Sequence, residues 1–256
     1  MLGVIGIGAV AAAIVAGLSE DKDPPRILLS PRNAGVAAKL AAAYPNVRVA
    51  GSNQEVVDGA GVVLLCVRPA DARQVMAELT FGDQSLISVM AGIPIRGLQQ
   101  LAPSVKNIAR AIPLPSVANR RGITPLYPAI EPARSLFGRL GRVIDVADET
   151  AFDHFSAATA TLAAHFLYLK EISSWLEAKG IAPSEAQNYV AAMFGELATS
   201  LQGHDTDFSE LLREHATPGG INELFCRVVG EEGVWTAVDL GLGRVRQALH
   251  DRQSHW

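Results

Sequence analysis

Cysteine is scarce in this sequence, and the two cysteines lie far apart. Cys66 and Cys226 are the only ones among 256 residues. This number and spacing exclude a disulfide framework and a cysteine-ligated metal site. We expect both to be small buried apolar residues in a reducing compartment, and we predict no metal site.

Excess positive charge is also lacking. The chain has 22 Lys and Arg against 26 Asp and Glu, a formal net charge of −4. No run of Lys and Arg and no basic stripe interleaved with aromatic residues is present, so a nucleic-acid partner is excluded. The expected partner is a small molecule.

The apolar N-terminal segment lacks the features of a signal or membrane segment. No Lys or Arg precedes Lys22, whereas a secretory signal begins with a basic region. The apolar run of residues 1–18 ends at Ser19 and has three glycines within its first eight residues, so it is too short and too interrupted to span a bilayer. We expect a cytoplasmic protein without a membrane segment.

Apolar residues, in contrast, are abundant at 49% of the chain, and they are ordered in short runs. Runs rich in Val, Ile and Leu alternate with helix-forming stretches such as residues 34–43 and 70–79. This alternation predicts an α/β fold with a Rossmann-type parallel sheet covered on both faces. The predicted strands are residues 2–7, 26–30, 47–49, 62–67, 85–89 and 107–110, with 122–127 and 142–146 as further strands at one edge.

The second half of the sequence has a helical pattern. Asp148 is positioned to cap a helix that runs toward Gly180, and Ser184 to cap a second helix that ends near residue 201. A polar segment, 202–209, precedes shorter helices, and a last helix covers 233–252. The sequence therefore predicts an α/β domain over residues 1–147 and an all-α domain over 148–256.

The most specific motif is the glycine turn after the first strand. Its pattern, G-x-G-x-x-A over residues 6–11, is the dinucleotide fingerprint. Gly6 permits the tight turn, Gly8 lets the backbone approach a pyrophosphate, and Ala11 allows close packing of helix on strand. The predicted cofactor-binding residues here are Gly6, Ile7, Gly8, Ala9 and Val10.

The end of the second strand distinguishes between the two dinucleotides. NAD sites place an acidic side chain there, whereas this sequence has Ser30, Arg32 and Asn33. A guanidinium group suits a 2′-phosphate, so NADP(H) is the predicted cofactor. The alternative is a helix-capping serine followed by a solvated arginine.

Two further turns follow predicted strands at the same edge of the sheet. The first turn could lay its backbone along the cofactor, although a plain strand-to-helix turn explains it equally well; its predicted cofactor-binding residues are Cys66, Val67, Arg68 and Pro69. The second is a tight turn, and its predicted cofactor-binding residues are Ala91 and Gly92.

These segments, taken in order, resemble those of pyrroline-5-carboxylate reductases. The resemblance spans nearly the whole chain and rests on residues 3–8, 30–32, 66–69, 91–93, 110–113, 122–127 and 217–220. It implies a Rossmann domain followed by a helical domain that interleaves with a second subunit. The implied reaction is hydride transfer from NAD(P)H to the imine carbon of pyrroline-5-carboxylate, which gives proline.

The sequence departs from this family on the substrate side. Leu114 replaces an amide residue, and the glycine-rich segment that starts the family's substrate domain becomes residues 159–165, which favour a helix. Ile221 and Asn222 replace two threonines. Asn222 matches the threonine whose hydroxyl the family places beside the substrate imine.

The candidate substrate residues follow from this alignment and from the chemistry. Thr217 and Asn222 could orient the imine nitrogen or a water molecule, and the turn at Gly219 and Gly220 could offer N–H groups to a carboxylate. The alternative for this turn is a plain helix–helix connection.

His165 is the third catalytic candidate. It lies one helical turn from Thr161, a candidate substrate-binding residue, and a histidine can shuttle a proton near neutral pH. The alternative is that His165 is a packing residue.

We therefore expect an NADPH-dependent oxidoreductase that acts on a cyclic imine. The alternatives are a related reductase for another imine or carbonyl compound, and a non-catalytic NADP(H)-binding regulatory protein. The apolar surface of the helix predicted over 184–201 also indicates a homodimer or a higher homo-oligomer.

Overall fold

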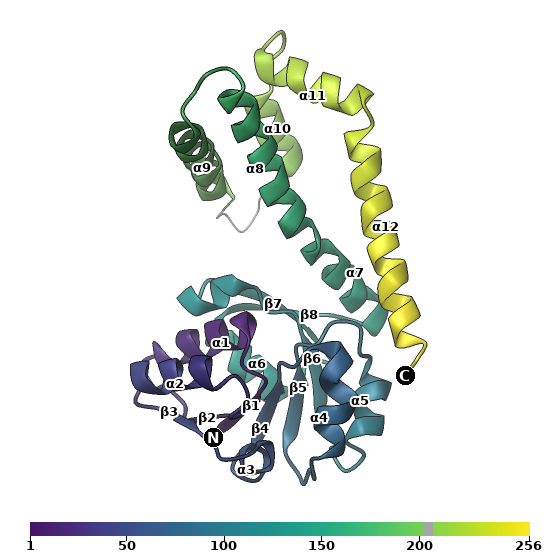
Figure 1. Ribbon diagram of the computed structural model, residues 1–256. Helices are drawn as coiled ribbons and strands as arrows, with labels where there is room; N and C mark the ends of the chain where they lie inside the picture. The colour runs from purple at the N-terminus through teal and green to yellow at the C-terminus, as the bar shows by residue number, and fades with distance from the viewer. Residues whose placement is uncertain (202–206) are drawn as a thin grey trace. The chain divides into compact units, whose positions relative to one another are not determined.

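The computed structural model describes residues 1–201 and 207–256 (Figure 1). The chain divides into two compact units. The first comprises residues 1–156 and 246–256, and the second comprises residues 157–245. Most of the polar segment predicted over 202–209 lies outside the described residues.

The first unit contains an eight-stranded sheet in the order β3-β2-β1-β4-β5-β6-β7-β8. The first six strands are parallel in the order typical of a dinucleotide-binding fold, β7 is antiparallel to β6, and β8 is parallel to β7. The predicted fold class is confirmed, and β3 and β7 match their predicted ranges. The strands are β1 (Leu2–Ile5), β2 (Ile27–Leu29), β3 (Val47–Val49), β4 (Val62–Leu65), β5 (Ser85–Ser88), β6 (Ile108–Ala111), β7 (Gly122–Tyr127) and β8 (Gly141–Asp145).

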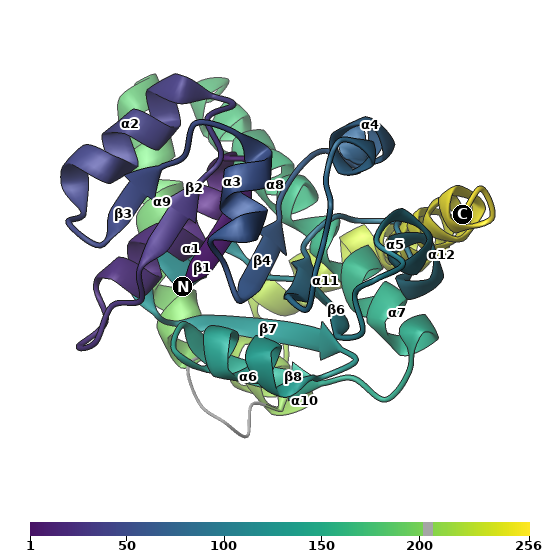
Figure 2. The ribbon, with the colours of Figure 1, turned by 90° about the horizontal axis from the view of Figure 1, so that it is seen from below.

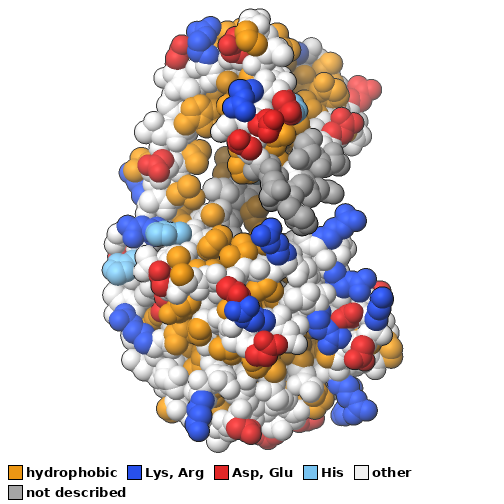
Figure 3. Space-filling model, turned by 180° about the vertical axis from the view of Figure 1, so that it is seen from behind, with side chains coloured by type: hydrophobic (Ala, Val, Ile, Leu, Met, Phe, Trp, Pro, Cys, Tyr) orange, Lys and Arg blue, Asp and Glu red, His pale blue; other side chains and the backbone are white. Residues whose placement is uncertain are grey.

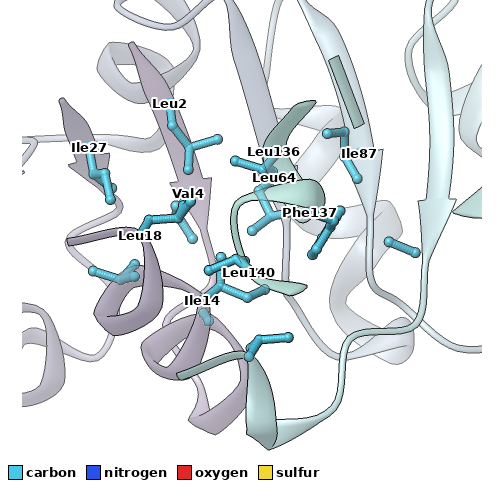
Figure 4. Packing of buried hydrophobic residues seen from close by; sticks show 14 of the residues in the cluster. Leu2, Val4, Ile14, Leu18, Ile27, Leu64, Ile87, Leu136, Phe137 and Leu140 are labelled. Carbon is cyan, nitrogen blue, oxygen red and sulfur yellow. The ribbon is translucent and has the colours of Figure 1, made fainter. Parts of the chain in front are cut away.

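Alternate residues of the central strands enter two separate hydrophobic cores. Val4 and Leu64 pack with helices α1 (Ala9–Ser19), α2 (Ala34–Ala43) and α6 (Glu131–Gly138) on one face (Figure 4). Ile5 and Leu65 pack with α3 (Asn53–Asp58), α4 (Ala72–Ala77) and α5 (Ile95–Leu101) on the other. Because both faces are covered, the strands are continuous apolar runs. Each large side chain buried in this way contributes roughly 1.5–3 kcal/mol.

The two additional strands extend the sheet at one edge. In Figure 2, β7, β8 and α6 lie together, and α6 connects the two strands along the chain. Leu136, Phe137 and Leu140 from this region join the first core. The edge strands therefore belong to the same folded unit as the glycine turn.

Six helices follow the sheet in the part of the chain that the structure describes. They are α7 (Glu149–Thr159), α8 (Thr161–Glu177), α9 (Pro183–Ser200), α10 (Phe208–His215), α11 (Ile221–Glu231) and α12 (Val234–Gln253). Asp148 caps α7 as predicted, since its Oδ1 accepts the N–H of Ala151 at 2.8 Å.

Two helix predictions were wrong in detail. The single helix predicted from 148 toward 180 is interrupted at Ala160, whose N–H donates to Ala157 in a tighter turn. Ser184 lies within α9 rather than at its cap, because the helix starts at Pro183, which is well suited to the first helical position.

The first unit includes more of the chain than the α/β domain predicted over residues 1–147. Residues 149–156 join it because Glu149 and Asp153 pair with the buried Arg110 of β6. Residues 246–256 join it because Gln253 bonds to Asp153 and Trp256 packs on Gly97 of α5. Sequence periodicity does not report such long-range pairs.

The second unit has almost no core of its own. Among its described residues, the buried ones are Ala157, Ser173, Ala186 and Val190. Large apolar side chains are exposed instead, among them Phe166 at 71% and Ile221 at 84%. Figure 3 shows hydrophobic side chains at the surface of this unit, in the upper part of the view. No helix in the described part of the chain is long and apolar enough to cross a membrane.

Candidate functional site

The turn at Gly6 connects β1 to α1 and requires glycine. Gly6 has a φ of +89°, a conformation that other residues rarely adopt. A Cβ atom here would lie 2.8 Å from the carbonyl carbon of Cys66 and from the nitrogen of Val67. The turn is thus pressed against the chain that leaves β4, and the predicted reason for this glycine is confirmed.

Gly8 differs from Gly6, because its missing side chain would point into open space. No heavy atom of the described chain lies within 4 Å of a Cβ built there. Helix α1 begins at Ala9, and within the described structure it has neither a side-chain cap nor an acidic residue in its first turn. Its first N–H groups and the positive end of its dipole are therefore available to an anion. This geometry fits the pyrophosphate of a dinucleotide.

The neighbouring residues of the motif pack the turn into the core. Ile7 and Ala11 are buried in the core next to α1, so Ile7 offers only its backbone to a ligand. Ala9 is exposed and Val10 is partly exposed at the start of the helix.

Ser30 and Asn33 support the glycine turn from the end of β2. Ser30 is fully buried, and its Oγ accepts the N–H of Gly6 at 3.0 Å. Asn33 has a φ of +67°, and its Nδ2 donates to the carbonyl of Ile7 at 2.8 Å. The sequence predicted both as direct cofactor contacts. In the structure both side chains bond to the turn and hold it in place, and their contact with the cofactor stays a prediction.

Arg32 lies in an ion cluster that the sequence did not predict. Its Nη2 is 3.6 Å from Asp71 Oδ2. Arg68 binds the same carboxylate through two bonds, Nε to Oδ2 at 3.0 Å and Nη2 to Oδ1 at 3.2 Å. These bonds from Arg68, opposed by a smaller desolvation effect, hold the pKa of Asp71 below its usual value, so it is ionised at neutral pH. Asp71 is partly buried at the predicted cofactor edge, and the two arginines around it are exposed.

The segment after β4 has the predicted form. Pro69 takes the first position of a short 3₁₀ helix, Pro69–Asp71. Cys66 and Cys226 are free thiols that are only partly buried, so the prediction of two buried residues was wrong. Desolvation by the surrounding side chains raises the pKa of Cys66, which makes this thiol a poor nucleophile.

The turn after β5 contacts the end of the last helix. Gly92 has a φ of +76°, and a Cβ there would lie 3.4 Å from Cδ of Arg252 and 3.8 Å from Leu249. Residues 246–256 of the first unit therefore back the Ala91–Gly92 turn. This contact joins segments more than 150 residues apart, and no sequence pattern pointed to it.

Arg110 is a buried hub at the carboxyl end of β6. Its Nη1 binds Glu149 Oε1 at 2.8 Å, its Nη2 binds Asp153 Oδ1 at 3.1 Å, and its guanidinium lies over the ring of Phe152. Its Nε is buried without an acceptor among the described residues. Glu149 also accepts the N–H of Ile95, so the hub links β6, α5 and α7. Arg110 belongs to the family-like segment 110–113, but the sequence alone predicts no role for it.

The candidate substrate residues Thr217, Gly219, Gly220 and Asn222 lie in the second unit, around the start of α11. The N–H of Gly219 donates to Glu223 Oε2 at 2.7 Å, and the N–H of Gly220 donates to the carbonyl of Thr217 at 2.9 Å. Both glycine N–H groups thus already have acceptors. An anion would instead meet the first-turn N–H groups of α11, which begins at Ile221.

Asn222, Thr161 and His165 have local contacts within the same unit. Asn222 Nδ2 donates to the carbonyl of His215 at 2.8 Å, and Thr161 Oγ1 donates to the carbonyl of Ala158 at 2.8 Å. His165 is exposed, and its ring meets that of Phe194 edge to face at 5.9 Å. Their assignment to the substrate stays a prediction.

Comparison with known proteins agrees with this geometry. Residues 1–92 match the family model described as "NADP oxidoreductase coenzyme F420-dependent", and the prediction of NADP(H) as the cofactor is confirmed by this match. The pyrroline-5-carboxylate reductase of Haemophilus influenzae is 32% identical over 184 residues, which cover 67% of this chain and 66% of that protein.

Other matches extend over the entire fold. The pyrroline-5-carboxylate reductase of Corynebacterium melassecola is 25% identical and covers 98% of this chain and 96% of its own length. The crystal structure of 1-pyrroline-5-carboxylate reductase from Streptococcus pyogenes has a TM-score of 0.81 at 22% identity and covers 97% of both chains. Fold, glycine turn and sequence similarity therefore agree: the chain belongs to the pyrroline-5-carboxylate reductase family.

Proposed function

We propose that this protein is an NADPH-dependent reductase that converts pyrroline-5-carboxylate to proline. The observation that carries the proposal is the glycine turn with open space at Gly8, in a chain that aligns over 98% of its length with a pyrroline-5-carboxylate reductase. When bound, the nicotinamide supplies the hydride for the imine carbon.

The cofactor-side residues have distinct tasks in this proposal. The first-turn N–H groups of α1 hold the pyrophosphate, and Arg32 pairs with the 2′-phosphate. Ser30 and Asn33 keep the turn in shape through their bonds to Gly6 and Ile7. The backbone of residues 66–69 and of the Ala91–Gly92 turn lines the same edge of the sheet.

The substrate-side residues orient the imine and supply a proton. The amide of Asn222 or the hydroxyl of Thr217 holds the imine nitrogen or a water molecule that protonates it. The first-turn N–H groups of α11 attract the substrate carboxylate. His165 is the side chain in this set that can donate or accept a proton.

Glu223 supports a second candidate, a reductase for an imine without a carboxylate. Its side chain bonds to the N–H of Gly219 and places a negative charge in the first turn of α11. A substrate carboxylate that approaches the same helix end meets this charge and is repelled. A neutral cyclic imine meets no such repulsion.

We also propose a homodimer. The second unit exposes Phe166, Trp235, Phe225 and other large apolar side chains and buries almost none. A second copy of the same unit would cover such surface.

The test is the oxidation of NADPH by the purified protein, followed with pyrroline-5-carboxylate and with a panel of cyclic imines that lack a carboxylate. Turnover with pyrroline-5-carboxylate supports the first proposal. Turnover with the neutral imines alone supports the second candidate. If NADPH binds and no compound is reduced, both fail and a non-catalytic NADP(H)-binding protein is indicated.

The variant Glu223→Gln refines this test. It removes the charge and keeps an oxygen that can accept the N–H of Gly219. If the substrate carries a carboxylate, the KM for pyrroline-5-carboxylate should fall by roughly two- to fivefold in Glu223→Gln, as expected for loss of one partly screened like charge. The variant Glu232→Gln, at the other end of α11, is the matched control.

A further inference from the structure

The ion cluster of Arg32, Arg68 and Asp71 does more than the proposed function assigns to it. We propose that Asp71 determines cofactor specificity. Its carboxylate holds Arg68 beside Arg32 and competes with the 2′-phosphate of NADP(H), and it thereby limits the preference for NADP(H) over NAD(H). This inference rests on the proposed function, because it takes NADP(H) to be the ligand of the glycine turn.

The topology places the cluster where the adenosine ribose of a dinucleotide lies. Arg32 follows β2, whereas Arg68 and Asp71 follow β4, and these strands flank β1 on its two sides. All three strands are parallel, so their carboxyl ends meet at one edge of the sheet. In this fold the residue after β2 reads the ribose 2′ position. Arg68 reaches the same position from the opposite side of the glycine turn.

The distances show that the two guanidinium groups share one acceptor. Asp71 Oδ2 is 3.0 Å from Arg68 Nη2 and 3.6 Å from Arg32 Nη2. Two positive charges are therefore held around a single carboxylate oxygen. A phosphate group has the same preference for arginine forks and more acceptor oxygens, so it can replace the carboxylate between them.

The exposure of the side chains allows this exchange. The side chains of Arg32 and Arg68 are 61% and 79% exposed, whereas that of Asp71 is 20% exposed. The arginines are thus open to a ligand, and the carboxylate is fixed at the base of the cluster. A ligand phosphate can approach both guanidinium groups without moving the backbone.

The charges determine the direction of the effect. A 2′-phosphate carries nearly two negative charges at neutral pH, as other phosphate monoesters do. The two arginines would balance this charge, but Asp71 cancels one of them and repels the phosphate. The 2′-hydroxyl of NAD(H) carries no charge and is not repelled. Asp71 therefore weakens the binding of NADP(H) and leaves that of NAD(H) nearly unchanged.

The experiment compares NADPH and NADH affinities of the full-length protein by nicotinamide fluorescence titration. For Asp71→Asn we expect the Kd of NADPH to fall roughly two- to fivefold, the range for a partly exposed charge pair, with the Kd of NADH unchanged. The gain should shrink at high salt, because salt screens exposed charges. Asp71→Ser is a second variant that removes the charge, and unfolding curves show that each protein is folded.

Arg68→Gln tests the other half of the cluster. We expect the Kd of NADPH to rise about three- to tenfold, as for loss of one charge-assisted contact, with the Kd of NADH unchanged. Adenosine 2′-phosphate, used as a probe that lacks the nicotinamide, should show the same pattern as NADPH in competition with it. Asp83→Asn, before β5 at the opposite edge of the sheet, is the matched control for the change in net charge in Asp71→Asn.

The outcomes separate this inference from the function on which it rests. If the wild type binds NADPH, and the Asp71 variants have the same ratio of NADH to NADPH dissociation constants or bind NADPH more weakly, the inference is overturned and the proposed function stands. If the wild type binds neither cofactor, the proposed function is overturned, and the inference with it. A lower Kd for NADPH alone supports both.

Discussion

The two units of this protein differ in how far they bury their apolar side chains. The first unit buries large side chains on both faces of its sheet, in two cores of buried Leu, Ile, Val and Phe. The second unit is built from long helices, and within its described residues the buried ones are Ala157, Ser173, Ala186 and Val190. The first unit thus has cores of its own, whereas the second leaves large apolar side chains exposed, which is the basis of the proposed dimer.

This difference explains where the candidate residues are well defined. The glycine turn is fixed by a core on each side and by the bonds from Ser30 and Asn33. The candidate substrate residues lie on a unit whose helices pack loosely by comparison. We therefore expect cofactor binding to depend on the first unit alone, and substrate binding to depend also on the proposed second copy that covers the second unit.

The largest effect is expected at the hub that ties residues 149–156 to the first unit. Arg110→Met removes the partner of Glu149 and Asp153 and leaves two partly buried carboxylates without their cation. We expect the free energy of unfolding to fall by about 3–5 kcal/mol, as for a buried pair that loses one partner. Chemical denaturation measures this loss. Arg142→Met, on the exposed side of β8, should change stability by less than about 0.5 kcal/mol; a similar loss in both variants would contradict the role of the hub.

The two glycines of the turn provide the next comparison. Gly6→Ala places a Cβ 2.8 Å from the Cys66 backbone at a positive φ, so we expect it to destabilise the protein by about 2–3 kcal/mol. Gly8→Ala meets no neighbouring atom and should leave stability within about 0.5 kcal/mol of wild type, yet weaken NADPH binding at least tenfold. Denaturation and fluorescence titration on both variants measure this difference. If Gly8→Ala binds NADPH normally, the pyrophosphate does not lie there.

The exposed apolar residues of the second unit should matter for assembly. Phe166 is 71% exposed on α8, and Phe166→Ser should weaken self-association about tenfold or more if a second copy covers it. Sedimentation across a concentration series gives the dissociation constant. Ile123→Thr removes an exposed apolar side chain from β7 of the first unit and should have no effect. A wild-type protein that sediments as a monomer at all concentrations would contradict the proposed dimer.

A smaller effect is expected where Trp256 packs on α5. A Cβ at Gly97 would lie 2.9–3.0 Å from Trp256, whose ring also lies under the guanidinium of Arg73 at 3.8 Å. Gly97→Ala should cost about 1 kcal/mol through overpacking. Gly138→Ala, in α6 with open space around it, should be neutral or slightly stabilising. An equal increase in the free energy of unfolding in both variants would show that Trp256 does not pack on Gly97.

The smallest effect concerns pH. A hydrogen bond from Arg139, assisted by the Lys22 N–H and by the charges of Arg139 and Arg120, lowers the pKa of Asp21. Because the folded-state pKa is lowered, this stabilisation is present above the ordinary carboxyl pKa and is lost as the pH falls through the lowered value. Asp21→Asn should therefore lower Tm slightly at neutral pH and have no effect in strong acid. A Tm difference that persists in strong acid would contradict this assignment.

The sequence predicted the α/β architecture well because its signals are local. Continuous apolar runs marked the strands, the glycine turn marked the start of α1, and Asp148 marked the start of α7. These features depend on neighbouring residues and on the geometry of one turn of helix or one strand. The helix break at Ala160 was not predicted, because alanine favours a helix and gives no signal that ends one.

The contacts around the site could not be predicted, because they join distant parts of the chain. The hydroxyl of Ser30 accepts the N–H of Gly6, and Asp71 brings together arginines that follow two different strands. Gly92 meets Arg252 across more than half of the sequence. A single sequence offers no periodicity or motif for such pairs, and only the folded sheet edge brings them together.

The most direct test of the account is the affinity of the full-length protein for NADPH and for NADH, measured side by side by fluorescence titration. The glycine turn, Arg32 and Arg68 predict saturable binding of both cofactors, with NADPH bound at least about tenfold more tightly, as expected for contacts between arginine and phosphate. Equal affinities, or tighter binding of NADH, would contradict the account.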